Sequence, residues 1–208
     1  TVINTSGHIW SITGIRSGTN ITLNVVDANG CESILVVNAP DCSCPGISAP
    51  VSGGNKSYCE GGTIPTITAV VSTGETVDWY NALSGGTLLK SSSLSYTPTV
   101  AGTYYAMTRN ITSGCVSSTR TPVKVTMNPL PIASLVSSYA DNIFCAGTTV
   151  LFTAEGGTNY NFKIGAVSMQ NSTSTVYTTK VLANGQIVSV VVTNSDGCSA
   201  TSAGITNT

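Results

Sequence analysis

One spacing occurs three times in the chain: a glycine is followed thirteen residues later by a cysteine, which itself comes directly after another glycine. The three copies run from Gly18 to Cys31, from Gly102 to Cys115 and from Gly185 to Cys198. The cysteines lie 84 and 83 residues apart, a period that fits a small β-sandwich module rather than a solenoid unit. The 208 residues therefore have room for two complete modules and the tail of another.

Each copy of the frame contains one apolar strand and then a polar turn. The turns cover residues 27–30, 110–114 and 194–197, and each begins with Asn or Asp and ends with Gly. Asn and Asp tolerate the left-handed backbone region, and Gly supplies positive φ without steric strain. The three turns are therefore predicted to be β-hairpin tips, each followed directly by its cysteine.

Two short proline-bounded junctions, residues 38–45 and 128–131, divide the chain. Residues 1–44 are expected to be the C-terminal part of one module, and residues 45–130 and 131–208 to be two β-sandwiches. Strands are expected at residues 7–12, 20–26, 33–37, 65–71, 76–80, 94–98, 103–109, 119–127, 148–154, 160–164, 173–178, 186–194 and 200–206. No helical period is sustained and the junctions are stiff, so an all-β, semi-rigid rod is predicted.

The apolar residues of the repeated strand predict which of its faces points inward. In the first and third copies these residues alternate in the same phase: Ile21, Leu23 and Val25, then Val188, Val190 and Val192. In the middle copy the corresponding residues are Tyr105 and Met107, but the start of that strand is apolar on both faces. Residues 102–104 could equally form a turn like a tyrosine corner, so the facing of this strand stays open.

Charged residues make up only 8% of the chain, against roughly a quarter in an ordinary soluble protein. With a net charge of -1 the chain offers no electrostatic footprint for nucleic acid or anionic lipid. Its apolar runs are far shorter than the roughly 18 residues that span a bilayer. No membrane insertion is expected, and the chain is interpreted as an excerpt whose targeting and anchoring signals lie elsewhere.

The chain has seven cysteines. Cys59 and Cys145 stand near the start of their modules, 86 residues apart, and each is predicted to pair with the cysteine that ends its own module, Cys59 with Cys115 and Cys145 with Cys198. The partner of Cys31 is expected to lie before Thr1, leaving Cys31 unpaired in this chain. Disulfide staples suit modules of this size, whose cores are thin, and indicate an oxidising compartment.

Cys42 and Cys44 are separated by one residue. They can bridge each other, which is the favoured interpretation, or reach partners outside this chain. Cys42 is not expected to bridge Cys31, because the strand between them carries the chain roughly 20 Å, whereas a disulfide needs Cα atoms within about 7 Å. Zinc is disfavoured because it takes four ligands and the single histidine, His8, is far from these cysteines.

No set of residues in the sequence indicates a catalytic site or a cofactor-binding site. His8 has no serine or cysteine elbow motif near it, so no hydrolytic triad is indicated. Glu75 and Asp78 are expected on opposite faces of one strand, and the acidic residues in general are expected to be solvated or to form turns. Trp79 and Trp10 are candidate sugar-stacking residues, although Trp79 is better explained as the core residue of a sandwich.

The middle module resembles the Ig-like repeats of Bacteroidetes surface proteins. The motifs that carry this resemblance are Tyr-Cys-Glu-Gly-Gly at 58–62, Val-Asp-Trp-Tyr-Asn at 77–81, Ala-Gly-Thr-Tyr-Tyr at 101–105 and Ser-Gly-Cys at 113–115. Residues 26–31 and 39–42 are similar to the repeat ends of the giant SprB-type gliding-motility adhesins. The resemblance implies tandem Ig-like or PKD-like modules, no catalytic residues, and export to the cell surface across the outer membrane by the type IX system.

The first hypothesis is therefore that the chain is a non-enzymatic, structural and adhesive segment of a filamentous surface adhesin that binds surface polysaccharide or the substratum. Its partners are expected to be neighbouring modules of a long chain, and unpaired strand edges leave lateral self-association open. The alternatives are an accessory region of a secreted polysaccharide-degrading enzyme or carbohydrate-binding protein, and a glycosylated receptor ectodomain. Burial of Trp79 would count against a sugar platform, and an unglycosylated Asn110 against the receptor.

Overall fold

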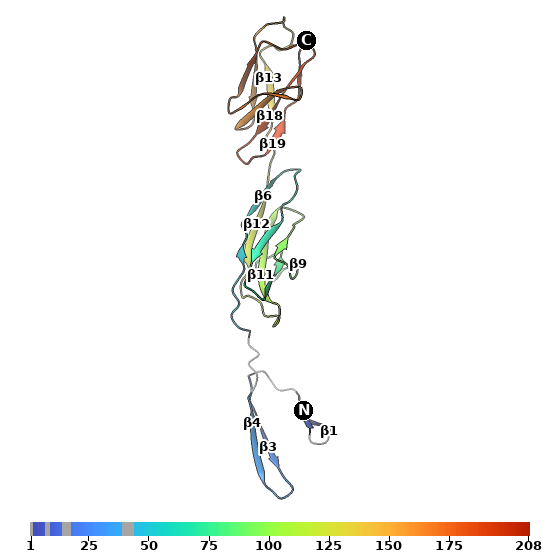
Figure 1. Ribbon diagram of the computed structural model, residues 1–208, viewed down its shortest axis with the longest axis vertical. Coiled ribbons are helices and arrows are strands. Elements are labelled where there is room, and N and C mark those ends of the chain that lie inside the picture. The colour runs from blue at the N-terminus through green and yellow to red at the C-terminus, as the bar shows by residue number, and fades with distance from the viewer. Residues whose placement is uncertain (1, 7–8, 14–17, 39–43) are drawn as a thin grey trace.

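The computed structural model describes residues 2–6, 9–13, 18–38 and 44–208. Every regular element in these ranges is a β-strand, as the sequence predicts. Two β-sandwiches follow one another along the long axis of the molecule (Figure 1). Within the described ranges there is no helix that could span a bilayer.

The middle sandwich faces a three-stranded sheet, in the order β10-β7-β5, with a five-stranded sheet, in the order β6-β12-β11-β8-β9. Its strands are β5 (Val51–Ser52), β6 (Lys56–Cys59), β7 (Ile67–Val70), β8 (Glu75–Tyr80), β9 (Leu88–Lys90), β10 (Ser95–Tyr96), β11 (Gly102–Asn110) and β12 (Thr121–Asn128). All neighbours are antiparallel except β6, which runs parallel to β12. This parallel pair brings the start and the end of the module to one edge of the sheet.

Aromatic side chains from three strands fill the middle core. Trp79 is completely buried, and its Nε1 donates a hydrogen bond to the carbonyl oxygen of Ser93 at 2.9 Å. Tyr104 is buried with Ala106, and its hydroxyl donates to the carbonyl oxygen of Val100 at 2.8 Å. Residues 102–104 therefore belong to β11 rather than to a turn, the side chain of Tyr104 points inward, and its hydroxyl makes the hydrogen bond to upstream backbone that is typical of a tyrosine corner.

The C-terminal sandwich repeats the plan with different strand lengths. Its sheets have the orders β13-β14-β17 and β16-β15-β18-β19, and β20 also pairs with β18. The strands are β13 (Ser134–Ser137), β14 (Val150–Glu155), β15 (Asn159–Ile164), β16 (Val167–Ser172), β17 (Val176–Thr179), β18 (Ile187–Thr193), β19 (Ser199–Thr201) and β20 (Ile205–Thr206). Val188, Val190 and Val192 are fully buried, which confirms the predicted inward face of β18.

The N-terminal part consists of two hairpins, β1 (Val2–Ser6) with β2 (Ile9–Ile12) and β3 (Ile21–Val26) with β4 (Glu32–Val37). Val25 and Leu35 are 60% and 58% exposed, so large apolar side chains of β3 and β4 face solvent. Two faces of a lone hairpin cannot enclose a core. That residues 1–44 are the C-terminal part of a module stays a prediction.

Candidate functional site: the stapled ends of the modules

The three predicted hairpin tips share one pattern of backbone hydrogen bonds, although the middle tip is one residue longer than the other two. The first residue of each tip donates its N–H to the carbonyl oxygen of the tip cysteine, at 3.0 Å for Asp27, 2.8 Å for Asn110 and 2.9 Å for Asn194. The glycine before each cysteine has positive φ, between 74° and 84°. The side-chain oxygen of the first residue accepts further backbone N–H groups of its own turn. These internal bonds hold each tip as a rigid support for its cysteine.

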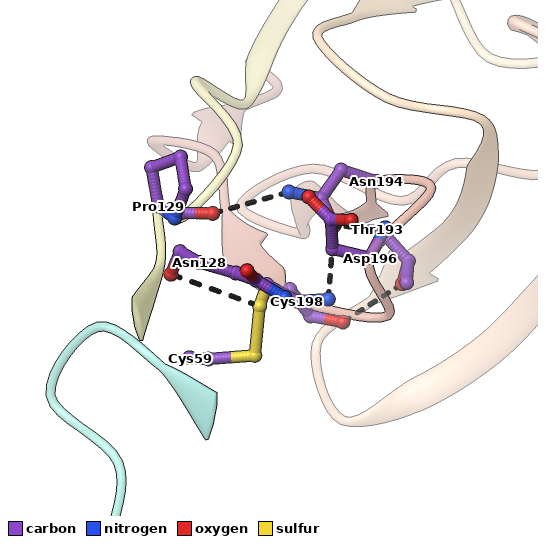
Figure 2. Close-up of a disulfide and its surroundings, with 8 residues drawn as sticks. Cys59, Asn128, Pro129, Thr193, Asn194, Asp196 and Cys198 are labelled. Carbon is purple, nitrogen blue, oxygen red and sulfur yellow. Dashed lines mark hydrogen bonds between the residues drawn. A yellow bond between two sulfur atoms is a disulfide. The ribbon is translucent and has the colours of Figure 1, made fainter. Parts of the chain in front are cut away.

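The tip of the C-terminal module is bonded covalently to the middle module (Figure 2). Cys198 forms a disulfide with Cys59, with a Cα–Cα distance of 5.5 Å. Cys59 is the last residue of β6 and lies opposite Asn128, the last residue of β12, in the parallel pair. The N–H of Glu60 donates to the carbonyl oxygen of Asn128 at 2.9 Å, which extends this pairing past the cysteine. The disulfide thus attaches the tip to the paired ends of two strands.

A polar contact accompanies this disulfide. Asn194 donates from Nδ2 to the carbonyl oxygen of Pro129 at 3.1 Å, while its Oδ1 accepts the N–H of Cys198 at 2.9 Å (Figure 2). The sulfur of Cys198 lies 3.9 Å from the carbonyl oxygen of Asn128, and Cys198 is completely buried. The tip is therefore seated against the segment through which the chain leaves the middle module.

A second disulfide fixes a hairpin tip at the other end of the middle module. Cys115, in the tip of that module, pairs with Cys44, with a Cα–Cα distance of 5.5 Å. Cys44 follows Cys31 by thirteen residues, and Asn128 follows Cys115 by thirteen residues, so Cys44 and Asn128 hold equivalent positions in the repeat. The tip of the middle module is thus bonded directly to the segment that leaves the preceding repeat, whereas the tip of the C-terminal module is bonded to β6 beside the equivalent residue, Asn128.

The predicted pairing within each module is wrong. Cys59 pairs with Cys198 rather than with Cys115, and Cys145 does not pair with Cys198. The reason is the length of the modules: β12 has eight residues, so the tip at one of its ends is roughly 24 Å from Cys59 at the other. A disulfide cannot cover that distance. Cys59 and Cys115 are thus kept apart by a strand in the same way as is expected for Cys31 and Cys42.

The favoured bridge between Cys42 and Cys44 is also wrong, because Cys44 is bonded to Cys115. Cys42 itself lies outside the described residues. Cys31 and Cys145 have free thiols and are exposed. The described part of the chain therefore has two disulfides and two free thiols. Cys31 is equivalent in the repeat to Cys115 and Cys198, and Cys145 is equivalent to Cys59.

The candidate sugar platform at Trp79 is excluded because the ring is completely buried and stacks on Tyr96, with ring centroids 6.1 Å apart. Trp10 lies in β2, opposite Asn4 in the register, and its side chain is outside the described part. His8 is likewise outside the described residues.

Asp78 is neither solvated nor in a turn, contrary to the general expectation for the acidic residues. Its carboxylate is buried and accepts hydrogen bonds from Arg109 Nε at 2.8 Å and from the N–H of Ser92 at 2.9 Å. Burial raises the pKa of Asp78, but the hydrogen bonds from Arg109 and Ser92 and the positive charge of Arg109 outweigh it, so the pKa is lowered overall. This pair ties β8 to β11.

Residues 48–129 match the family model described as "Ig-like domain CHU_C associated". No curated protein sequence matches the chain. Solved structures with a similar arrangement include the fibronectin(III)-like modules of Clostridium thermocellum CbhA, at 18% identity over 77% of this chain and 92% of that chain, with a TM-score of 0.41. Domains A168–A170 of titin match at 12% identity over 92% of this chain and 75% of that chain, with a TM-score of 0.38.

The eight N-terminal Ig domains of Down Syndrome Cell Adhesion Molecule match at 11% identity and a TM-score of 0.45, over 91% of this chain and 35% of that chain. The two facing sheets of each sandwich, and the family match over residues 48–129, identify Ig-like β-sandwich modules, a fold typical of non-catalytic domains. Its disulfides are characteristic of proteins outside the cytosol. The feature that distinguishes this chain is the way its modules are joined.

Proposed function

We propose that the chain is a load-bearing repeat segment of a large filamentous adhesin on the cell surface, with a structural and adhesive role in gliding motility. The observation that supports this function is the disulfide between Cys59 and Cys198, which joins two successive modules along the long axis of the molecule. The resemblance of the sequence to gliding-motility adhesins supplies the biological setting. The adhesive target proposed is surface polysaccharide or the substratum.

The disulfide changes the path that tension takes through the chain. When the two ends are pulled, tension passes from Cys59 across the bridge to Cys198, and the chain between them is bypassed. That bypassed part contains β7 to β17 and all of β18, which include every buried residue of the two core clusters. Both sandwiches can therefore carry load without being pulled apart, which is the property that a stalk on a moving surface needs.

Single-molecule pulling between the two termini tests this mechanism. Reduction of both disulfides should release the 139 residues between Cys59 and Cys198, or roughly 480 Å of additional extended length. The double variant Cys59→Ser, Cys198→Ser keeps the disulfide between Cys44 and Cys115, which still bypasses 71 residues. Relative to the wild type with both disulfides, this variant should therefore extend by only about 68 residues (139 − 71), or roughly 240 Å.

The double variant Cys44→Ser, Cys115→Ser is the matched control for this experiment. It loses a disulfide of the same geometry, but its loop ends inside the stretch that the other bridge already bypasses. No gain in extended length is expected from it. Equal gains from the two double variants would show that tension does not pass through Cys59 and Cys198, and would remove the basis for a load-bearing role.

The cellular part of the proposal is tested by detecting the native polypeptide with an antibody against this chain. A very large polypeptide exposed on the surface of the producing cell is expected. A polypeptide only a few modules longer, released together with glycanase activity, would instead make this region a spacer in a secreted enzyme.

A further inference from the structure

The distal end of the C-terminal module, which is the end remote from the middle module, is built like the distal end of the middle module. Thr208 donates its N–H to the carbonyl oxygen of Asn142 at 3.1 Å and accepts the N–H of Phe144 at 3.4 Å. A residue bonded in this way lies opposite Ile143 in a parallel pair. In the middle module Thr126 lies opposite Ser57, and Ser57 precedes Ile143 by 86 residues, so the two parallel pairs are equivalent.

Cys145 follows Ile143 by two residues, as Cys59 follows Ser57 in the middle module. It lies 86 residues after Cys59 and is preceded by an aromatic residue, Phe144, as Cys59 is preceded by Tyr58. Cys59 is bonded to the tip of the module that follows it, whereas Cys145 is exposed and its thiol is free. The same strand end is therefore presented twice, once with a tip attached and once without one.

We propose that this distal end is a docking site for the cysteine-bearing hairpin tip of a further Ig-like module, and that Cys145 forms a disulfide with the tip cysteine. The partner is defined by its chemistry: a hairpin that begins with Asn or Asp and ends with Gly-Cys. Such a tip is already seated on the equivalent end of the middle module, where Asn194 contacts the departing chain.

A second observation points to an incoming group at this end. A hollow of about 150 Å³ lies beside Cys145, lined by both of its sequence neighbours, Phe144 and Ala146, and by Asn207. Asn207 is only 1% exposed, and its Oδ1 has no hydrogen-bond partner among the described residues, although its Nδ2 donates to the carbonyl oxygen of Gln186. A buried, unpaired amide oxygen is unfavourable, and a donor supplied by a docked tip would satisfy it.

The chain itself contains a tip with which to test the proposal. Cys31 is exposed and free, and it follows a hairpin tip with the same internal hydrogen bonds as the tip that ends in Cys198. The two free, described thiols are thus complementary: one lies in a tip and the other on an end that accepts a tip. Cys31 of one copy is expected to bond to Cys145 of a second copy.

The reaction needs a disulfide oxidant, for which oxidised glutathione serves in the experiment. The thiolate of Cys145 attacks one glutathione sulfur, forming a mixed disulfide and releasing one reduced glutathione. The thiolate of the tip cysteine then attacks the sulfur of Cys145 and releases the second. Two protein thiols are oxidised and one glutathione disulfide is reduced to two thiols, so electrons and protons balance.

The experiment mixes two variants of the 208-residue chain, both with Cys42→Ser so that this residue contributes no thiol. One also has Cys31→Ser and keeps the accepting end, and the other has Cys145→Ser and keeps the tip. After equilibration in a glutathione redox buffer, mass spectrometry counts the disulfides between chains. The control for the tip chain carries Cys31→Ser, Cys145→Ser and Ala166→Cys, which places an exposed thiol on the hairpin between β15 and β16.

The bond between Cys145 and Cys31 is expected in about tenfold excess over the bond between Cys145 and the cysteine at position 166, since docking adds the equivalent of one or two hydrogen bonds. Equal yields, or a preference for joining two accepting ends, would overturn the proposal. Purified chains are used, so the result is independent of whether the native protein is adhesive. A failed load test and a failed docking test can therefore be told apart.

Discussion

The middle and C-terminal modules differ in their interiors and agree at their ends. The middle core is built around Trp79, with an ion pair between Asp78 and Arg109 on the other face of β8. The C-terminal core is built around Phe152 and Phe162. Both tips nevertheless have the same pattern of backbone hydrogen bonds, and each is followed by a cysteine whose disulfide partner lies before the module to which the tip belongs.

This difference shows which part of the repeat is specified closely. Many combinations of apolar residues fill a sandwich of this size, because a core needs the right volume and alternation more than particular residues. A disulfide between modules tolerates much less, since its two cysteines must meet within a narrow range of distances. The repeated unit of this protein is therefore best defined by its junctions, and its cores are free to vary.

If the cores are independent, the largest effects should come from core substitutions and stay within one module. Trp79→Ala is expected to destabilise the middle module by about 4 kcal/mol, because a large ring and its hydrogen bond to Ser93 are lost. Hydrogen exchange, measured peptide by peptide in the intact chain, should rise over β8 and β11 and stay unchanged over β15 and β18. Phe162→Ala is the matched substitution and should give the opposite pattern.

A rise in exchange across both modules in either variant would contradict the independence of the cores. It would mean that the disulfide between Cys59 and Cys198 couples the unfolding of one module to the unfolding of the other, in addition to holding the two modules together. Repeating the hydrogen-exchange measurement after the disulfides are reduced tests this explanation, because coupling through the disulfide between Cys59 and Cys198 would then disappear.

Gly156 packs against the backbone of Ile132, where the chain enters the C-terminal module. The glycines of the tips also have positive φ, but none of them is in such close contact. Gly156 has φ of +107°, and a Cβ added to it would lie within 1.9 Å of the carbonyl oxygen of Ile132. Gly156→Ala should therefore destabilise the C-terminal module by about 3 kcal/mol, through backbone strain and a clash with the main chain. Denaturation monitored by hydrogen exchange of β14 and β15 measures it.

Gly165→Ala is the control for this substitution. Gly165 also has positive φ, +58°, but a Cβ there would meet nothing within 4 Å. Only the conformational term remains, and it costs about 1 kcal/mol. Equal effects of the two substitutions would show that the contact with Ile132 is relieved at no cost.

The ion pair between Asp78 and Arg109 should make the middle module sensitive to acid. Because the pKa of Asp78 is lowered in the folded state, its contribution to stability is present above the ordinary aspartate pKa, near 3.9, and is lost as the pH falls through the lower folded value. Asp78→Asn should destabilise the middle module by about 2 kcal/mol at neutral pH, and the difference from the wild type should shrink on acidification.

Asp196→Asn provides the comparison for the C-terminal module, where the carboxylate is in the exposed tip. Urea denaturation of both variants at pH 7 and at low pH measures the effect. A difference between wild type and Asp78→Asn that stays constant with pH would mean that the carboxylate stabilises the module by its shape rather than by its charge.

The fold could be predicted from the sequence where alternation and turn residues agree. Val188, Val190 and Val192 alternate cleanly, and their inward face was predictable. β16 was missed because it ends in three polar residues and has few β-branched or aromatic residues. The last expected strand is interrupted at residues 202–204 and forms β19 and β20 instead. The tips were predictable because Asn, Asp and Gly have definite backbone preferences.

The disulfide partners could not be predicted in the same way, because pairing depends on which ends of the modules meet in space. One signal was available: Cys44 and Asn128 follow their tip cysteines by the same number of residues, which places both beside the next tip. The length of β12 was a second signal, since it separates Cys59 from Cys115. The buried pairing of Asp78 with Arg109 had no local signal, because the two residues are 31 apart and on different strands.

The smallest predicted effect distinguishes the two tips from each other. Asn194→Ala removes the acceptor for the tip N–H groups and the donor to Pro129, whereas Asn110→Ala removes only hydrogen bonds within its own tip. Each should destabilise its tip by about 1 kcal/mol. Only Asn194→Ala should also loosen the angle between the two sandwiches, because the disulfide alone leaves rotation about its own bonds. Residual dipolar couplings measured for each module report that angle, and identical alignment in the two variants would leave the disulfide as the sole determinant of the geometry of the junction.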